Sequence, residues 1–264
     1  MLLSKLMSLF LLTLVRFLTG AQARWYGCPP KAEQRIYFAN PQSHADLVMI
    51  WAALPQELRS ITRPIAARDY WTKTPFRQWI TTAVFNAVYV TRQPAPAQPA
   101  AAAATATDGA AGAMAGLSAL SAAVADAALA TAGGPDPVPD ALPPEPTPEA
   151  LRAAVRPDDP LAPLVQALES GDSIVIFPEG TRGHGDEPQP FKSGLYMLAR
   201  MFPQVVLVPA WINNVQRVMP KGEVVPVPIL CSVTFGAPIA LAPGEERRPF
   251  LDRARAAVIA LRDI

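Results

Sequence analysis

Two polar turns stand out in the sequence because each follows an apolar run typical of a buried strand. The first runs from Asn40 to Asp46 and the second from Pro178 to Arg182. A third polar group, Arg92, ends another strand-like run. In open α/β sheets the ligand site lies at the carboxyl ends of the strands, so all three could face one site. Carboxylates and guanidinium groups gathered there would suit proton transfer and the binding of anions.

Each of these groups also has a simpler interpretation. Ser43 and Asp46 are spaced as in a capping box of a helix that begins at Ser43. Capping this helix could be the whole role of Asp46. Arg92 could end its strand in solvent. Glu179 and Arg182 could form a surface ion pair, which contributes little stability. The residue types alone leave these alternatives open.

Strand-like and helix-like runs alternate along the chain, which predicts an α/β fold with a mixed, largely parallel sheet. The runs that are apolar at nearly every position favour strands buried on both faces. The expected strands are 35–38, 83–91, 173–177, 205–210 and 229–235. The expected helices are 44–53, a segment after Tyr70, 161–168, a helix that opens at 191–194 and ends near 200, and 248–261.

Four short blocks, in order along the chain, resemble those of the glycerolipid acyltransferase superfamily, typified by bacterial 1-acylglycerol-3-phosphate acyltransferase. The most specific is Phe-Pro-Glu-Gly-Thr-Arg at 177–182. Asn-Pro-Gln-Ser-His-Ala-Asp at 40–46 is similar to the first block of the family, Asn-His-x-Ser-x-x-Asp. Val-Thr-Arg at 90–92 and Val-Pro-Ala at 208–210 resemble the second and fourth blocks. The resemblance covers 34–239 apart from an insert.

The resemblance implies a glycerol-3-phosphate acyltransferase-like fold, with helices flanking the central sheet. It also implies transfer of an acyl chain from acyl-CoA or acyl-carrier protein to a lysophosphatidate-like acceptor in phospholipid biosynthesis, without a metal or cofactor. Asp46 would orient the general base. The glycerol phosphate would be bound by Arg92, Glu179, Gly180, Thr181 and Arg182, and Lys192 would add a nearby charge.

The first block departs from the family pattern at its most consequential position. Where the family has the histidine that acts as general base, this chain has Pro41, which carries no titratable group. His44 could substitute, but it lies only two residues before Asp46, about 200° around a helix, so the two side chains would not pair. The sequence therefore also admits a second interpretation, a catalytically inactive relative that binds lipid or acyl donor.

Residues 1–23 are expected to form an apolar helix that associates with the membrane, on the cytoplasmic face of the inner membrane. The uncharged stretch from Leu6 to Val15 is too short to span a bilayer, since Lys5 and Arg16 flank it. Two alternatives remain: a signal peptide that ends at Ala21-Gln22-Ala23, and an ordinary core helix. In the signal-peptide interpretation the chain would be a secreted structural or interaction protein.

Residues 24–264 would then form the acyltransferase-like domain, interrupted by an Ala/Pro-rich insert at 93–160 that is expected to be flexible. The chain of 264 residues has a net charge of only +1, which gives no reason to expect nucleic-acid binding. The insert holds 8 acidic and 2 basic residues, so the remaining residues, 21 basic and 14 acidic, carry a net charge of +7. Such a charge favours an anionic membrane surface and a phosphate-bearing substrate.

Overall fold

The structure, a computed structural model, describes residues 2–20, 22–41, 46–90, 145–180, 187–213 and 231–264. The described residues form a seven-stranded sheet in the order β1-β7-β6-β2-β5-β3-β4. Strands β6, β2, β5, β3 and β4 are parallel, β7 runs antiparallel to β6, and β1 is parallel to β7. The predicted mixed, largely parallel sheet is confirmed. The strand bounds are Gln22–Trp25 (β1), Arg35–Ala39 (β2), Thr62–Ala67 (β3), Val88–Val90 (β4), Ser173–Ile176 (β5), Val206–Asn213 (β6) and Ser232–Phe235 (β7).

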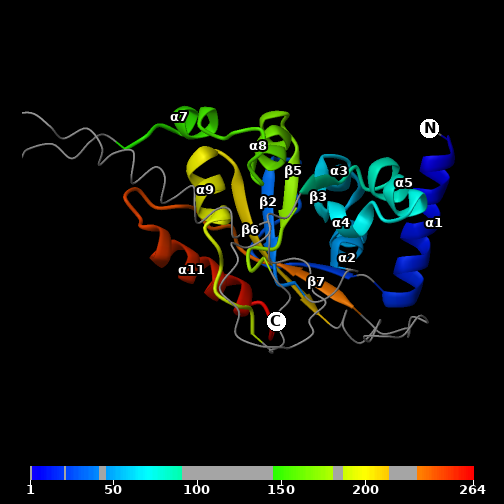
Figure 1. The fold of residues 1–264 in the computed structure, drawn as a ribbon. Helices are drawn as coiled ribbons and strands as arrows, with labels where there is room; N and C mark the ends of the chain where they lie inside the picture. Colours follow the sequence, from blue (N-terminus) through cyan, green and yellow to red (C-terminus); the bar gives the residue numbers. More distant parts are fainter. Residues whose placement is uncertain (1, 21, 42–45, 91–144, 181–186, 214–230) are drawn as a thin grey trace, which may run out of the picture.

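Helices cover both faces of the sheet (Figure 1). Their bounds are Leu2–Thr19 (α1), Asp46–Ala53 (α2), Gln56–Ser60 (α3), Arg68–Trp71 (α4), Pro75–Ala83 (α5), Pro148–Ala153 (α7), Ala162–Glu169 (α8), Gly194–Met201 (α9) and Arg247–Ile259 (α11). Successive side chains of a strand point to opposite faces. Accordingly Ile36 and Phe38 of β2 pack with α7, α8, α9 and α11, whereas Tyr37 and Ala39 pack on the other face with α1, α2 and α3.

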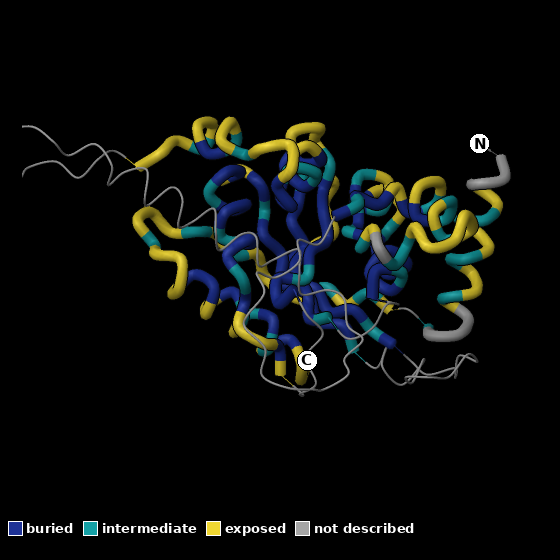
Figure 2. The backbone as a smooth tube through the Cα atoms, in the orientation of Figure 1, coloured by how far each residue is buried: buried dark blue, intermediate teal, exposed yellow. Residues whose placement is uncertain are grey.

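The central strands are buried on both faces, as their continuous apolar runs predict. Every residue of β2 and β5 is buried, and Figure 2 shows the strands enclosed between the helices. The predicted strand at 83–91 was too long, because α5 continues to Ala83 and β4 holds only Val88–Val90. Strands β1 and β3 were not predicted.

The folded part resumes earlier than the predicted end of the insert at residue 160. Residues 145–160 are described and include α7, which packs against α9 and buries Leu151. Thr147 caps this helix by accepting the backbone N–H of Ala150 at 3.2 Å, and Pro148 occupies its first turn. The remainder of the predicted insert, 93–144, lies outside the described residues.

The predicted apolar N-terminal helix exists as α1, but it ends at Thr19 and not near residue 23. Gly20, at φ 65°, donates its N–H to the carbonyl of Arg16 at 2.8 Å, and β1 begins two residues later. Leu11, Leu12 and Val15 pack on the core of the domain. The opposite side of α1 exposes Leu6, Leu9, Phe10 and Leu14. Among the described helices, none is long and apolar enough to cross a membrane.

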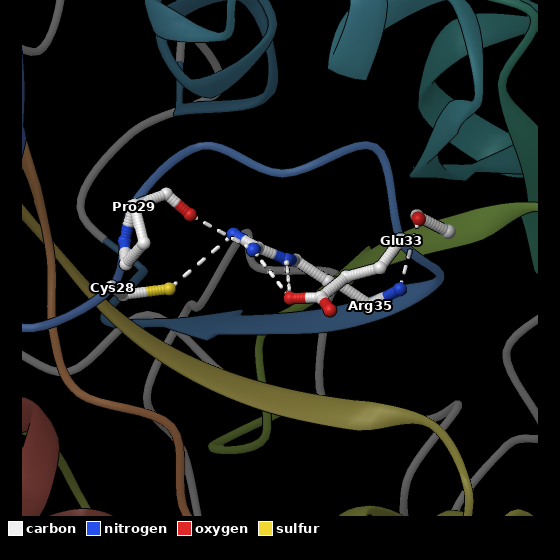
Figure 3. Close-up of polar contacts among 5 residues, drawn as sticks. Cys28, Pro29, Glu33 and Arg35 are labelled. Atoms are coloured by element: carbon white, nitrogen blue, oxygen red, sulfur yellow. Dashed lines mark hydrogen bonds and ion pairs between the residues drawn. The ribbon is translucent and has the colours of Figure 1, made fainter.

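A buried arginine fixes the chain at the amino end of β2 (Figure 3). Arg35 is 1% exposed, and its guanidinium donates to Glu33 at 2.5 Å, to the carbonyl of Pro29 at 2.9 Å and to Cys28 Sγ at 3.3 Å. Its backbone N–H donates to Ser173 Oγ of the neighbouring strand at 2.9 Å. Burial raises the pKa of the Cys28 thiol, which disfavours a nucleophilic thiolate. This cluster therefore ties the β1–β2 connection to the sheet.

Candidate active site

Both polar turns start at the same edge of the sheet, on neighbouring strands. Strands β2 and β5 pair in parallel, with Phe38 opposite Ile176, so their carboxyl ends lie side by side. The backbones there are about 4.8 Å apart. The turn that follows β2 leads through Asn40 and Pro41 to Asp46, and the turn that follows β5 begins with Pro178. The predicted juxtaposition of the two turns is therefore present at their described ends.

Asn40 joins the end of β2 to the neighbouring strand β6. Its side-chain amide accepts the backbone N–H of Ile212 at 2.8 Å and donates to the carbonyl of the same residue at 3.2 Å. Asn40 is 4% exposed, so both bonds are sheltered from water. Asn40 belongs to the first block, but no role was predicted for it. The structure identifies it as the residue that fixes where this turn leaves the sheet.

Asp46 is the first residue of α2 and is buried at the amino end of the helix. A carboxylate at this position interacts favourably with the partial positive charge of the helix terminus. Pro41 is half-buried and directly follows Asn40, and its ring keeps the preceding residue in an extended conformation. Ser43 and His44 lie outside the described residues, so neither the predicted cap nor the substitution by His44 is placed.

Glu179 is a buried carboxyl group in the second turn. It is 3% exposed, and its Oε2 accepts the backbone N–H of Gln189 at 2.8 Å. Burial raises the pKa of Glu179 to about 7, against the lowering effects of the Gln189 bond and the Arg255 charge. Its carboxylate thus holds the segment that returns from the turn, a contact that no local sequence pattern indicates.

Backbone hydrogen bonds shape the same turn. Gly180 has φ 69°, a left-handed conformation that glycine adopts without strain, and donates its N–H to the carbonyl of Phe177 at 3.1 Å. The N–H of Lys192 donates to the carbonyl of Pro178 at 2.9 Å, which brings residue 192 beside the turn. Burial lowers the pKa of the Lys192 ammonium group. Lys192 therefore lies near the second turn in space as well as in sequence.

The C-terminal helix α11 supports the returning segment from outside. Arg255 donates from Nε to the carbonyl of Pro188 at 2.7 Å and approaches Glu187 at 3.4 Å. Gln189, which binds Glu179, is the next residue along the chain. Helix α11 was predicted but this contact was not, because it joins residues 67 apart in the chain.

Residues 153–213 match the family model described as Acyltransferase. This segment contains β5, the second turn, α9 and β6. A solved structure with the same fold is that of the 1-acyl-sn-glycerophosphate (LPA) acyltransferase PlsC from Thermotoga maritima. It aligns with a TM-score of 0.56 and 17% sequence identity over 98% of this chain and 78% of that one. The family model thus covers the segment that contains the second turn, and the structural likeness shows the same fold. No curated protein matches the sequence of this chain.

Three site residues expected from the acyltransferase superfamily lie outside the described residues: Arg92, Thr181 and Arg182. Their points of attachment are nevertheless described. Strand β4, which precedes Arg92, ends at Val90 two strands away from β5 and runs parallel to it through β3. Two strand spacings amount to about 10 Å. The strands that precede the second and third blocks therefore end at the same edge of the sheet.

Proposed function

We propose that the chain transfers an acyl chain from acyl-CoA or acyl-carrier protein to a lysophosphatidate-like acceptor. The observation that supports this proposal most is the position of the first block and of the Pro-Glu-Gly-Thr-Arg turn on adjacent parallel strands. In the reaction, the acceptor hydroxyl attacks the thioester carbon and loses its proton. A new ester forms, the carbon–sulfur bond breaks, and the thiol leaves.

The second turn is proposed to bind the acceptor phosphate. Arg182 and Arg92 would supply paired donors to its oxygens, and Thr181 a hydroxyl. The left-handed conformation of Gly180 would let the backbone approach the phosphate closely. Glu179 is buried and bonded to Gln189, so we assign it the task of positioning this turn. This role differs from the direct phosphate contact that the resemblance implied.

The site lacks the histidine that accepts the proton in the acyltransferase superfamily. Asp46 is placed to orient a base, but position 41 holds a proline. Loss of a general base typically lowers the rate by ~10² to 10⁴. We therefore propose slow turnover for the chain as it stands. Pro41 equally favours a second candidate function, a relative that binds lysophospholipid or acyl donor without transferring the acyl chain.

The acceptor is a lipid, and α1 offers a means of reaching it. Its exposed apolar residues, Leu6, Leu9, Phe10 and Leu14, form a surface that would bury in a bilayer interface. The net positive charge of the chain outside the insert would add attraction to anionic lipids. We propose that α1 holds the enzyme at the cytoplasmic face of the inner membrane.

The test is transfer of a labelled acyl chain to lysophosphatidate by the full-length protein, compared with transfer to monoacylglycerol, which lacks the phosphate. Supplying the label as acyl-CoA or as acyl-carrier protein identifies the donor. Arg182→Gln is expected to lower kcat/KM for lysophosphatidate and to leave that for monoacylglycerol almost unchanged. The control Arg248→Gln removes an exposed charge on α11 and should change neither.

Lysophosphatidate binding without any labelled product would favour the binding protein. If lysophosphatidate neither binds nor reacts, or if Arg182→Gln affects both acceptors equally, the proposed acceptor site is wrong.

A further inference from the structure

Two arginines contact the carboxyl-terminal part of α2, where α1 packs against it, at the opposite end of this helix from Asp46. Arg59 of α3 stacks its guanidinium over the ring of Trp51, 4.9 Å from the ring centroid. Trp51 is a buried residue of α2. Arg16, in the last turn of α1, donates from Nη2 to the carbonyl of Ala52 at 3.4 Å. Helix α1 thus contributes Arg16 to this junction, α2 contributes Trp51 and Ala52, and α3 contributes Arg59.

The positive charge at this junction is not balanced by the described side chains. Burial lowers the pKa of Arg59, and the neighbouring charge of Arg16 lowers it further. Among the described groups, Glu57 on the same short helix is the one that raises the pKa of Arg59. In the described part of the chain neither Arg16 nor Arg59 forms a salt bridge with a carboxylate. Both guanidiniums contact neighbouring residues of α2, Ala52 and Trp51, and neither is paired with a described carboxylate.

One hydrogen-bond donor at the junction is also unused. Arg59 Nη1 is enclosed by the protein and has no hydrogen-bond partner among the residues that the structure describes. Burying a charged donor without an acceptor is costly, and most buried polar atoms in folded proteins have a partner. A tetrahedral oxyanion has several acceptor oxygens and could bind both guanidiniums at once. Such a ligand would remove the repulsion and supply the missing acceptor together.

We propose that Arg16 and Arg59 form a binding site for a phosphate-type oxyanion, distinct from the site at the carboxyl edge of the sheet. The ligand is either inorganic phosphate or the phosphate of a lipid headgroup. The second source has a structural basis, because the exposed apolar residues Leu9 and Phe10 lie on the same helix as Arg16. Trp51 would hold the Arg59 guanidinium in place for either ligand.

The first test measures thermal unfolding in sodium phosphate and in sodium chloride of equal ionic strength. It uses full-length protein carrying Arg92→Gln and Arg182→Gln, so that phosphate binding at the proposed acceptor site does not contribute. Phosphate is expected to raise Tm in a saturable way. Adding Arg59→Gln should weaken the apparent phosphate affinity roughly tenfold or more, whereas adding Arg248→Gln should not change it.

Arg59→Lys serves where the glutamine variant does not fold, since it keeps the charge and loses the planar fork. Arg16→Gln should weaken phosphate binding without lowering Tm in chloride, because the lost bond to Ala52 is offset by relief of repulsion. A purely structural pair of arginines would give equal losses of Tm in both salts, and that result would overturn the proposal.

The second test separates the two sources of phosphate. The protein is sedimented with phosphatidylcholine vesicles, with and without phosphatidate. If the ligand is a lipid headgroup, Arg59→Gln removes the part of the binding that depends on phosphatidate, while Arg248→Gln retains it. If the ligand is inorganic phosphate, Tm responds but vesicle binding is the same for both variants. A response in neither test refutes the site.

Discussion

The side-chain amide of Asn40 is bonded at both of its polar atoms to the backbone of Ile212. Asn40 Oδ1 accepts the N–H of Ile212 at 2.8 Å, and Nδ2 donates to its carbonyl at 3.2 Å. The bonds continue the pairing of β2 with β6 one residue beyond Ala39, where the first block leaves the sheet. The segment that leads to Asp46 is thereby anchored to a central strand.

Asn40→Ala is expected to destabilise the fold and to misplace the first block. The substitution leaves a buried N–H and a buried carbonyl of Ile212 without partners, at a cost of about 1–3 kcal/mol. Urea denaturation measures the loss. The control is Asn213→Ala, which removes the same side chain from the half-buried end of β6 and should cost less. Equal stability losses in the two variants would contradict the anchoring role.

Glu179 is expected to make stability depend on pH. Its folded pKa, about 7, lies above the ordinary value of 4.5, so the folded state binds more protons between these pH values. Stability should therefore fall as the pH rises from 4.5 to 7 and then level off. Glu179→Gln removes the titrating carboxyl group and with it this contribution to the pH dependence of stability. The free energy of unfolding of the wild type relative to the variant should decrease across this window by at most roughly 3 kcal/mol. Parallel pH profiles would show that Glu179 is not buried as described.

Arg255 is expected to act on Glu179 through its charge. Its positive charge lowers the pKa of Glu179, so Arg255→Gln should raise that pKa and extend the pH-dependent loss of stability above pH 7. The variant also loses the bond to the carbonyl of Pro188, worth about 1 kcal/mol. The control, Arg248→Gln, removes an exposed charge from the same helix.

A double-mutant cycle isolates this coupling. When Glu179→Gln is already present, Arg255→Gln should no longer alter the pH profile. If the profile still shifts, Arg255 acts through a group other than Glu179.

The centre of the fold was predicted well from the sequence, because the central strands are apolar at nearly every position and such runs are typical of buried strands. Strands β2, β5 and β6 are continuous apolar runs and were located to within three residues at either end. Strand β1 was missed because its side chains alternate between exposed and half-buried. Strand β3 was missed because Arg63 and Pro64 interrupt its apolar pattern. Both β1 and β3 form because they pair with neighbouring strands, although their own residues favour a strand only weakly.

The polar turns were predicted from local blocks, but the contacts that support them were not. The bonds of Asn40 to Ile212 and of Arg255 to Pro188 join residues 172 and 67 positions apart. The spacing of residues within a short block does not indicate contacts between residues so far apart in the chain. Helix α7 was assigned to the insert because of its Ala/Pro-rich surroundings, yet it is capped by Thr147, buries Leu151 and donates from Arg152 to the carbonyl of Met201.

The most direct test of this account compares labelled acyl transfer to lysophosphatidate by the chain as it stands and by Pro41→His. Pro41→Ala separates loss of the proline ring from gain of a base, and Pro41→His combined with Asp46→Asn tests whether the new base needs its orienting carboxylate. If the missing base limits the reaction, kcat rises on the order of 10²- to 10⁴-fold in Pro41→His only, and the gain is lost in the combined variant. Equal rates for the original chain and Pro41→His would show that the missing base does not limit the reaction.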